Sequence, residues 1–284
     1  MAMSSKIQLE QTALRIRLGI IRAISSNHGG HIGGSLDLAD MLAVVYSDFM
    51  RIRPEDPNWG NRDFMIFSKG HAGPALYAAL AEKGYFSAER LENLNKTNNL
   101  LPGHCDRTKV PGVDATTGSL GQGLSLACGV ALSSKVKHTD QRVFCVTGDG
   151  ESAEGQIWEA AQFAAHYKLD NLIAFLDWNK MQIDGSNDEV LSLGNPIAKY
   201  EAFGWNATKV KGTDVEAIQA AVNGYIQNPN GKPSMIVLDT VKGQGAQCIM
   251  SMANNHCIGF PDELKNKVME ELREQGKNLG MEVK

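Results

Sequence analysis

The chain has 284 residues, of which 43% are hydrophobic and 21% are charged, a composition typical of a soluble globular protein. Its formal net charge of -4 and its lack of Lys/Arg runs argue against nucleic-acid binding. The N-terminal residues lack the apolar core of a signal peptide, and no apolar run approaches the roughly 18 residues of a membrane span. The five cysteines form no CxxC pair, so we expect reduced thiols in a cytoplasmic protein.

Apolar patterns and turn residues predict alternating helices and strands. The expected helices cover residues 8–26, 36–49, 74–84, 88–96, 119–135, 157–165, 214–227 and 262–275. The expected strands cover residues 63–68, 142–147, 172–177, 205–210 and 234–239. This alternation predicts an α/β fold in which a parallel sheet is sandwiched between helices. We expect a single domain over residues 1–284, with a short polar tail after about residue 276.

Cap and turn residues predict several helix ends. Pro74 near a first turn and Gly84 just past a last turn fit the usual asymmetry of helices. Thr213 and Glu216 have the spacing of a capping box, and Asp262 is expected to cap the closing helix. Residues 97–117 are expected to be mostly loop.

The most informative segment runs from residue 148 to residue 185. It opens with Gly148-Asp149-Gly150 after one expected strand and includes Asn179 just after the next. If these strands are parallel neighbours, Asp149 and Asn179 converge at the carboxyl edge of the sheet, where such folds bind ligands. A carboxylate and a carboxamide suit magnesium that completes its octahedron with phosphate oxygens. Taken alone, however, a GDG triplet is usually a turn and an Asn at a strand end is often only a cap.

The whole segment resembles the thiamine diphosphate motif, in which GDG is followed about thirty residues later by Asn. The sequence NKMQIDG at residues 179–185 looks like the transketolase version of that motif. The resemblance implies thiamine diphosphate together with Mg²⁺, or another divalent cation such as Ca²⁺ or Mn²⁺. It implies that Asp149, Asn179 and the backbone carbonyl of Met181 bind the metal, and that Gly150 and Asn179 contact the cofactor.

Four histidines in loops resemble further transketolase segments, although a single loop histidine is most often a solvated surface residue. His31 lies in GHIGGS, and its family counterpart is near the transferred carbonyl. His71 lies in SKGH and is implied to contact the diphosphate, whereas His104 in PGH is implied to face substrate hydroxyls. His256 has the family offset from the TVKGQG segment, but Cys257 follows it where the family has glycine.

Two other segments extend the resemblance. Residues 117–123 resemble TGPLGQG, with Ser119 in place of proline, and imply that Gly118 and Leu120 present backbone groups to the diphosphate. The helix start that follows favours an anion. Glu154 matches a glutamate that joins a proton network at the family's subunit interface, but it is equally a first-turn carboxylate that complements a helix dipole.

The resemblance covers about residues 10–275 and implies transfer of a two-carbon ketol unit from a ketose (phosphate) donor to an aldose (phosphate) acceptor. It matches only the first of three transketolase domains, without the pyrimidine-binding domain whose glutamate activates the cofactor. We therefore expect the N-terminal subunit of a split transketolase, which acts with a partner chain of similar size in a heterotetramer. His31, His104, His256 and Glu154 are the expected catalytic residues.

Three alternatives stay open. The chain could serve a split enzyme for an unusual ketose in a specialised sugar catabolic pathway. It could belong to another thiamine enzyme, either a 1-deoxyxylulose-5-phosphate synthase or the α subunit of a 2-oxo-acid dehydrogenase, which shares the metal motif. It could also be a non-catalytic binding relic, although the intact Asp149, Asn179 and Glu154 argue against this.

Overall fold

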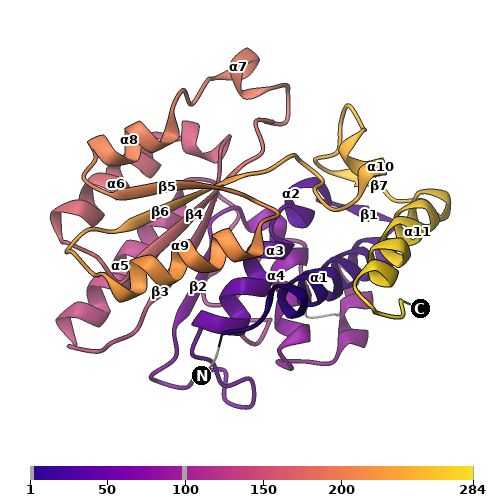
Figure 1. The fold of residues 1–284 in the computed structure, drawn as a ribbon, viewed down its shortest axis with the longest axis horizontal. Coiled ribbons are helices and arrows are strands. Elements are labelled where there is room, and N and C mark those ends of the chain that lie inside the picture. Colours follow the sequence, from indigo (N-terminus) through magenta and orange to yellow (C-terminus); the bar gives the residue numbers. More distant parts are fainter. Residues whose placement is uncertain (1–2, 98–100, 284) are drawn as a thin grey trace.

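A five-stranded parallel sheet forms the centre of the protein (Figure 1). The computed structural model describes residues 3–97 and 101–283. The strands, in spatial order, are β2 (Phe64–Phe67), β3 (Val143–Gly148), β4 (Leu172–Trp178), β6 (Ser234–Asp239) and β5 (Asn206–Lys211). Every neighbouring pair in this sheet is parallel. The predicted α/β fold is confirmed.

The central strands are buried on both faces. Along β3, Phe144 and Val146 join the hydrophobic core on one face, whereas Val143 and Cys145 join the core on the other. Successive side chains of a strand point to opposite faces, so a strand that is covered on both sides needs a continuous apolar run. For this reason β3, β4 and β6 could be predicted from their continuous apolar runs.

Helices cover both faces of the sheet. One core is built against α5 (Gln122–Val136), α6 (Gly155–His166) and α8 (Pro196–Ala202). The other is built against α1 (Lys6–Ser26), α3 (Ala39–Val44), α4 (Gly73–Glu82) and α9 (Val215–Gln227). The last helix, α11 (Asp262–Asn278), packs beside α1 at one end of the molecule (Figure 1).

Several element boundaries differ from the prediction. The helix expected at 36–49 is divided into α2 (Gly33–Leu36), α3 and a π-helical turn over Val45–Phe49. The segment expected as a helix at 88–96 is a 3₁₀ helix over Ala88–Asn93, and part of the expected loop at 97–117 lies outside the described residues. The sequence pattern did not predict α7 (Asn187–Val190), α8 and α10 (Gln247–Met250), of which α7 and α10 are single turns. A single turn is too short to show helical periodicity.

Two expected caps are also wrong. Asp214, not Thr213, is the N-cap of α9, and its side chain accepts a hydrogen bond from the Ala217 N–H at 3.0 Å. Pro261 occupies the N-cap position of α11, so Asp262 lies in the first turn, where a carboxylate still complements the dipole. Adjacent polar residues offer the same local chemistry, and only the backbone path decides which of them caps.

A short antiparallel pair ties two distant loops together. It joins β1 (Gly29–Gly30) to β7 (Ile258–Gly259). The Phe260 N–H donates to the His28 carbonyl at 2.9 Å, and the Gly33 N–H donates to the Asn255 carbonyl at 3.0 Å. The loop after α1 and the loop before α11 therefore lie side by side. The exposed His28, for which the sequence indicated no role, contributes its backbone to this junction.

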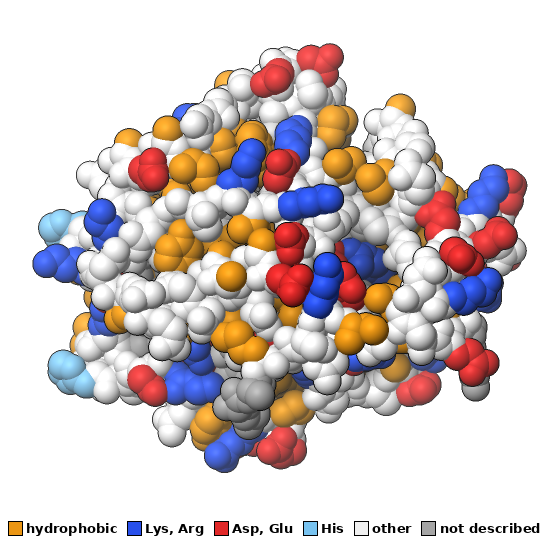
Figure 2. All heavy atoms as spheres, viewed as in Figure 1, with side chains coloured by type: hydrophobic (Ala, Val, Ile, Leu, Met, Phe, Trp, Pro, Cys, Tyr) orange, Lys and Arg blue, Asp and Glu red, His pale blue; other side chains and the backbone are white. Residues whose placement is uncertain are grey.

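The surface carries charges of both signs. Figure 2 shows Lys/Arg and Asp/Glu side chains interspersed on one face. None of the described helices is long and apolar enough to cross a membrane. The five cysteines are free thiols, of which Cys105, Cys128 and Cys145 are buried, Cys248 is partly buried and Cys257 is exposed.

Two glycines of α5 provide a matched test of helix–strand packing. A Cβ on Gly123 would lie 2.5 Å from the Cα of Ser68, whereas a Cβ on Gly129 would meet nothing within 4 Å. We expect Gly123→Ala to lower the free energy of unfolding by about 1–3 kcal/mol, because the helix must move away from the chain after β2. Gly129→Ala should instead raise it by about 0.5–1 kcal/mol. Urea denaturation of both variants checks this, and equal effects would contradict it.

Candidate active site

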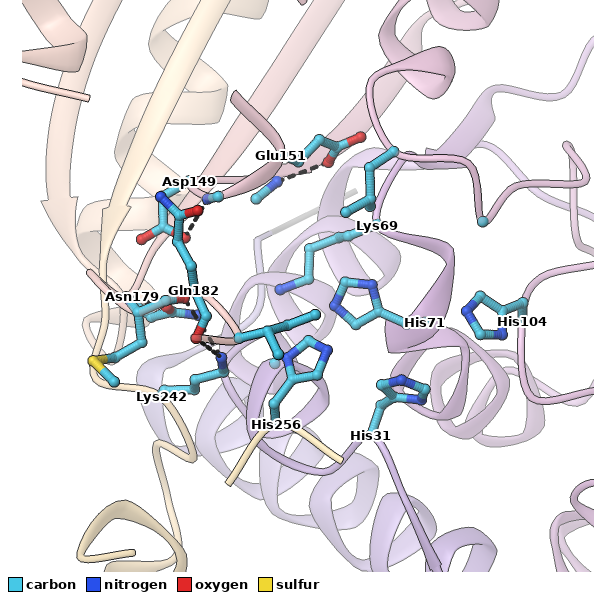
Figure 3. Close-up of a pocket in the computed structure, with 17 residues that line it drawn as sticks. His31, Lys69, His71, His104, Asp149, Glu151, Asn179, Gln182, Lys242 and His256 are labelled. Atoms are coloured by element: carbon cyan, nitrogen blue, oxygen red, sulfur yellow. Dashed lines mark hydrogen bonds between the residues drawn. The ribbon is translucent and has the colours of Figure 1, made fainter. Parts of the chain in front are cut away.

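A cavity of about 300 Å³ opens at the carboxyl edge of the sheet (Figure 3). It is lined by the chain that follows β2, β3 and β4, together with the loops that carry His31, His104 and His256. The predicted cofactor, metal and histidine residues all line this cavity: His31, His71, His104, Gly118, Leu120, Asp149, Gly150, Asn179, Met181 and His256. Glu154 is not among the lining residues. The structure thus gathers residues that are more than 200 positions apart in the sequence.

Asp149 is held in a fixed orientation directly after β3. Its carboxylate accepts hydrogen bonds from the Gly150 N–H at 2.8 Å, the Lys180 N–H at 2.6 Å and the Asn187 side-chain amide at 2.9 Å. The residue is only 4% exposed. Burial raises the pKa of Asp149, and the nearby Asp177 adds to this effect. A divalent cation at this edge would stabilise the ionised carboxylate.

Asn179 is oriented by two carboxylates at the end of β4. Its Nδ2 donates to Asp37 at 2.9 Å and to Asp177 at 3.2 Å. Carboxylate groups that only accept must face the amide nitrogen, so Oδ1 faces the other way and accepts from the Met181 N–H at 3.0 Å. The amide is thereby held in one orientation, in a residue that lines the cavity.

The donor set fits a hard divalent cation. It consists of the Asp149 carboxylate, the Asn179 amide oxygen and the Met181 backbone carbonyl, all from residues that line one cavity. Within the described ranges, no group of three His, Cys, Asp or Glu side chains is placed to hold a metal ion. A cation bound here would therefore take its remaining ligands from water or from an anionic cofactor, as Mg²⁺ commonly does.

A buried charge cluster adjoins the cavity, and its member Lys69 is one of the lining residues. Lys69, 3% exposed, forms an ion pair with Asp177. Burial lowers the pKa of Lys69, but Asp177 and Asp37 outweigh this effect, so that the pKa lies above its ordinary value. Burial raises the pKa of Asp37 well above its ordinary value, and Asp177 contributes to the same shift. The cluster stabilises the groups that orient Asn179.

Lys242 is the second lysine of the cavity wall. Its ammonium group lies 3.4–3.5 Å from the carbonyls of Gln182 and Met181. Burial lowers the pKa of Lys242, and the neighbouring charge of Lys69 lowers it further. Both lysines lie inside the glycine-rich motifs of the sequence, but no role was predicted for them. Their position inside segments that resemble those of the family was the only signal available.

Four histidines form one cluster on the side of the cavity away from Asp149 (Figure 3). The ring centroid of His31 lies 5.3 Å from that of His71, 5.4 Å from that of His104 and 5.2 Å from that of His256. The rings of His71 and His256 are 4.9 Å apart. The β1–β7 pair explains this proximity, because it holds the loops of His31 and His256 together.

Three of these histidines are neutral at physiological pH. Burial and Lys69 lower the pKa of His71 to about 2, and burial and Lys242 lower the pKa of His256 to about 4. Burial and His104 lower the pKa of His31. A neutral imidazole has one N–H donor and one nitrogen acceptor, so each ring can both give and accept a hydrogen bond.

The backbone of the turn at Gly118 lies close to the side chain of His104. Its φ of 153° is positive, and a Cβ there would lie 3.1 Å from the Cδ2 atom of His104. The Thr117 hydroxyl donates to the Phe67 carbonyl at 2.6 Å and fixes this turn against the end of β2. Gly118 and Leu120 consequently form a wall of the cavity.

At the start of α5, where we expected an anion to bind, the carboxylate of Glu151 already occupies part of the site. Its buried carboxylate accepts from the N–H groups of Gly121 and Gly148, each at 2.9 Å, and from the Ser68 hydroxyl. The N-cap amide of α5 is thus already paired with a carboxylate. Glu151 was not predicted as a site residue, although an acidic residue directly after GDG was a visible signal.

Glu154 occupies a different environment. It is exposed and is the N-cap residue of α6, without a side-chain capping bond. A side chain at this place is available to another subunit, so the implied interface role stays a prediction.

Comparison with known proteins identifies the family. A family model described as "Transketolase, thiamine diphosphate binding domain" matches residues 9–283. The chain belongs to the transketolase family. It is 45% identical over 271 residues to the 6-deoxy-6-sulfo-D-fructose transketolase subunit of Clostridium sp. (strain MSTE9), covering 95% of this chain and 98% of that subunit. It is 37% identical to an apulose-4-phosphate transketolase subunit of Phocaeicola vulgatus, covering 87% of this chain and 88% of that subunit.

Solved transketolases share the fold. The Campylobacter jejuni transketolase superposes with a TM-score of 0.88 at 30% identity, covering 99% of this chain and 44% of that one. Human transketolase-like protein 2 is 40% identical, covering 94% of this chain and 42% of that protein. The chain therefore spans about two fifths of the length of these transketolases and nearly all of the transketolase subunits. It corresponds to the thiamine diphosphate-binding domain.

The histidine cluster predicts a pH-dependent stability. Because the pKa of folded His71 lies near 2 and its ordinary value is 6.5, the unfolded chain binds more protons below pH 6.5. The contribution of His71 to the free energy of unfolding should fall as the pH decreases from 6.5, by about 1–2 kcal/mol at pH 5. His71→Gln should flatten this dependence, whereas His166→Gln, at an exposed position of α6, should not. Denaturation curves recorded between pH 7 and pH 5 give the free energy of unfolding of the wild type and both variants. The same pH dependence in all three proteins would contradict the assignment.

Proposed function

We propose that this chain is the cofactor-binding subunit of a two-subunit transketolase. The observation that carries the proposal is the single cavity in which the oxygen donors after β3 and β4 face a cluster of four histidines. Relatives that are named as transketolase subunits match nearly the whole chain. The reaction would transfer a two-carbon ketol unit from a ketose (phosphate) to an aldose (phosphate).

The metal and the cofactor would bind together at the Asp149 edge of the cavity. Asp149, Asn179 and the Met181 carbonyl would hold Mg²⁺ or a similar divalent cation. His71, Gly118, Leu120 and Gly150, all lining the cavity, would hold thiamine diphosphate together with Asn179. When bound, thiamine diphosphate supplies the carbon nucleophile and the electron sink for the two-carbon transfer.

The remaining histidines would handle the sugar. Neutral His31 and His256 can accept a proton from a substrate hydroxyl and return it, which is the work of a general acid/base pair. His104 is exposed at the edge of the cluster, where its ring can meet sugar hydroxyls as they enter. Cys257 is exposed beside His256 and occupies the position where the family has glycine.

A partner chain would complete the site. The carboxylates that line the cavity within residues 3–97 and 101–283 are Asp149 and Glu151, and both lie at the strand edge rather than beside the histidines. The glutamate that activates the pyrimidine ring would therefore come from a C-terminal transketolase subunit. We propose a heterotetramer with two such shared sites, with the exposed Glu154 at the interface between them.

A second candidate concerns the donor sugar. The 45% identical relative is named for 6-deoxy-6-sulfo-D-fructose, and another is named for apulose-4-phosphate. These names favour a specialised ketose over the common sugar phosphates. Measuring kcat/KM of the assembled enzyme for a 6-sulfo ketose and for fructose 6-phosphate separates the two, and a higher value for fructose 6-phosphate would eliminate this candidate.

Partner dependence is directly testable. We expect the purified chain, given thiamine diphosphate and Mg²⁺, to show no more than about 1% of the ketol transfer seen after addition of a pyrimidine-domain partner chain, because the activating carboxylate is missing. Coupled assays of aldose release check this. Full activity of the chain alone would refute the split arrangement. Calorimetry that detects binding of neither cofactor nor metal, even with the partner present, would instead favour a non-catalytic relic.

Two alanine variants should separate cofactor binding from substrate handling. Asp149→Ala should abolish Mg²⁺-dependent binding of thiamine diphosphate, because it removes the only charged group of the proposed metal donor set. His104→Ala should leave cofactor affinity within about threefold and lower kcat/KM by about 10²-fold, the low end of losses for an acid/base group. Calorimetry and steady-state kinetics of the assembled enzyme measure both. An equal loss of cofactor affinity in the two variants would count against these roles.

A further inference from the structure

Asn187 is a buried residue beside the metal carboxylate to which neither the sequence motifs nor the comparisons assign a role. It is the first residue of α7 and is 5% exposed. Its Nδ2 donates to Oδ2 of Asp149 at 2.9 Å, the same oxygen that accepts from the Lys180 N–H at 2.6 Å. Two donors from one loop therefore fix one oxygen of the expected metal ligand.

That loop is folded back on itself. Met181 forms an isolated antiparallel bridge with Ser186, the Gln182 N–H donates to the Gly185 carbonyl at 2.8 Å, and the Asn187 N–H donates to the Lys180 carbonyl at 2.9 Å. Lys180 and Asn187 thus stand at the two ends of a closed loop. Both ends are bonded to Asp149, and the loop between them carries the Met181 carbonyl.

The amide oxygen of Asn187 indicates that this residue does more than stabilise the local structure. Its Oδ1 is buried and has no hydrogen-bond partner among the described residues. An unsatisfied buried acceptor costs about 1–3 kcal/mol. The helix cap does not require Asn187 either, because Ser186 and Glu189 form the capping box of α7.

We infer that Asn187 is a positioning residue of the metal site, which ties the loop of the Met181 carbonyl to the carboxylate of Asp149. The inference rests on the proposed function, since it assumes a divalent cation between these two groups. By holding one Asp149 oxygen and the loop together, Asn187 sets the spacing of two metal donors before the ion arrives. Outer groups of this kind typically change metal affinity by 10–100-fold when they are removed.

Two variants and one control test the inference in the full chain. Asn187→Leu has nearly the same size and no donor, and Asn187→Ala serves if the leucine variant does not fold. Ser186→Ala removes the cap of α7 but leaves the amide that bonds Asp149. This control separates fraying of the short helix from loss of the tether.

The first measurement needs no ligand. In hydrogen exchange of the chain, the Lys180 amide should exchange at least about tenfold faster in Asn187→Leu than in the wild type, whereas Ser186→Ala should change it less than about threefold. The second measurement titrates Mg²⁺ into the assembled enzyme with saturating thiamine diphosphate. Mg²⁺ affinity should fall by about 10–100-fold in Asn187→Leu and by less than about threefold in Ser186→Ala.

The outcomes are distinct. Unchanged exchange or unchanged Mg²⁺ affinity in the Asn187 variants would overturn the positioning role, as would equal losses in Ser186→Ala. A wild-type enzyme that binds no Mg²⁺ with thiamine diphosphate would overturn the proposed function and with it the metal role of Asn187. The exchange result alone would then still decide whether the loop is tethered through this side chain.

Discussion

The parallel pairing of β3 with β4, in register from Val143 and Leu172 to Gly148 and Asp177, brings both strands out at one edge of the sheet. Asp149 and Asn179 directly follow these strands, and the chain between them forms α6, β4 and their connections. The apolar runs that bury both strands fix this register, since a slip by one residue would turn each core side chain to the opposite face. The chemistry of the site thus depends on the packing of the sheet.

At this edge of the sheet, electrostatic interactions determine how the buried charged groups pair. Three buried carboxylates, those of Asp37, Asp149 and Asp177, lie close to Lys69, and each would be costly to bury alone. Lys69 pairs with Asp177, and the amide of Asn179 donates to both Asp37 and Asp177. Asp149 instead accepts from the Gly150 and Lys180 N–H groups and from Asn187, and it is the carboxylate that we propose as the metal ligand. Burial and Lys69 lower the pKa of His71, and burial and Lys242 lower the pKa of His256, so both rings stay neutral beside the cavity.

The sequence predicted much of the fold because its signals there were local. Continuous apolar runs identified β3, β4 and β6, and the helical spacing of apolar residues identified α6. Prediction failed elsewhere: the helix expected at 36–49 is divided into shorter elements, and the single turn of α7 is too short to show a periodic pattern. The candidate site followed the same rule. Motif residues such as His71 were found, whereas Asp37 and Asn187 were not, because their partners lie 142 and 38 residues away.

The sequence by itself determined the cofactor motif and the family. The glycines, the histidines and the two oxygen donors of the motifs follow one another along the chain at characteristic spacings. Only the tertiary structure decided how these residues act together. The β1–β7 pair brings His31 to His256, and the Lys180 N–H and the Asn187 side chain bond the loop that contains Met181 to the carboxylate of Asp149. Such contacts join segments that are independent in sequence, and their geometry and pKa values arise from burial that no local pattern encodes.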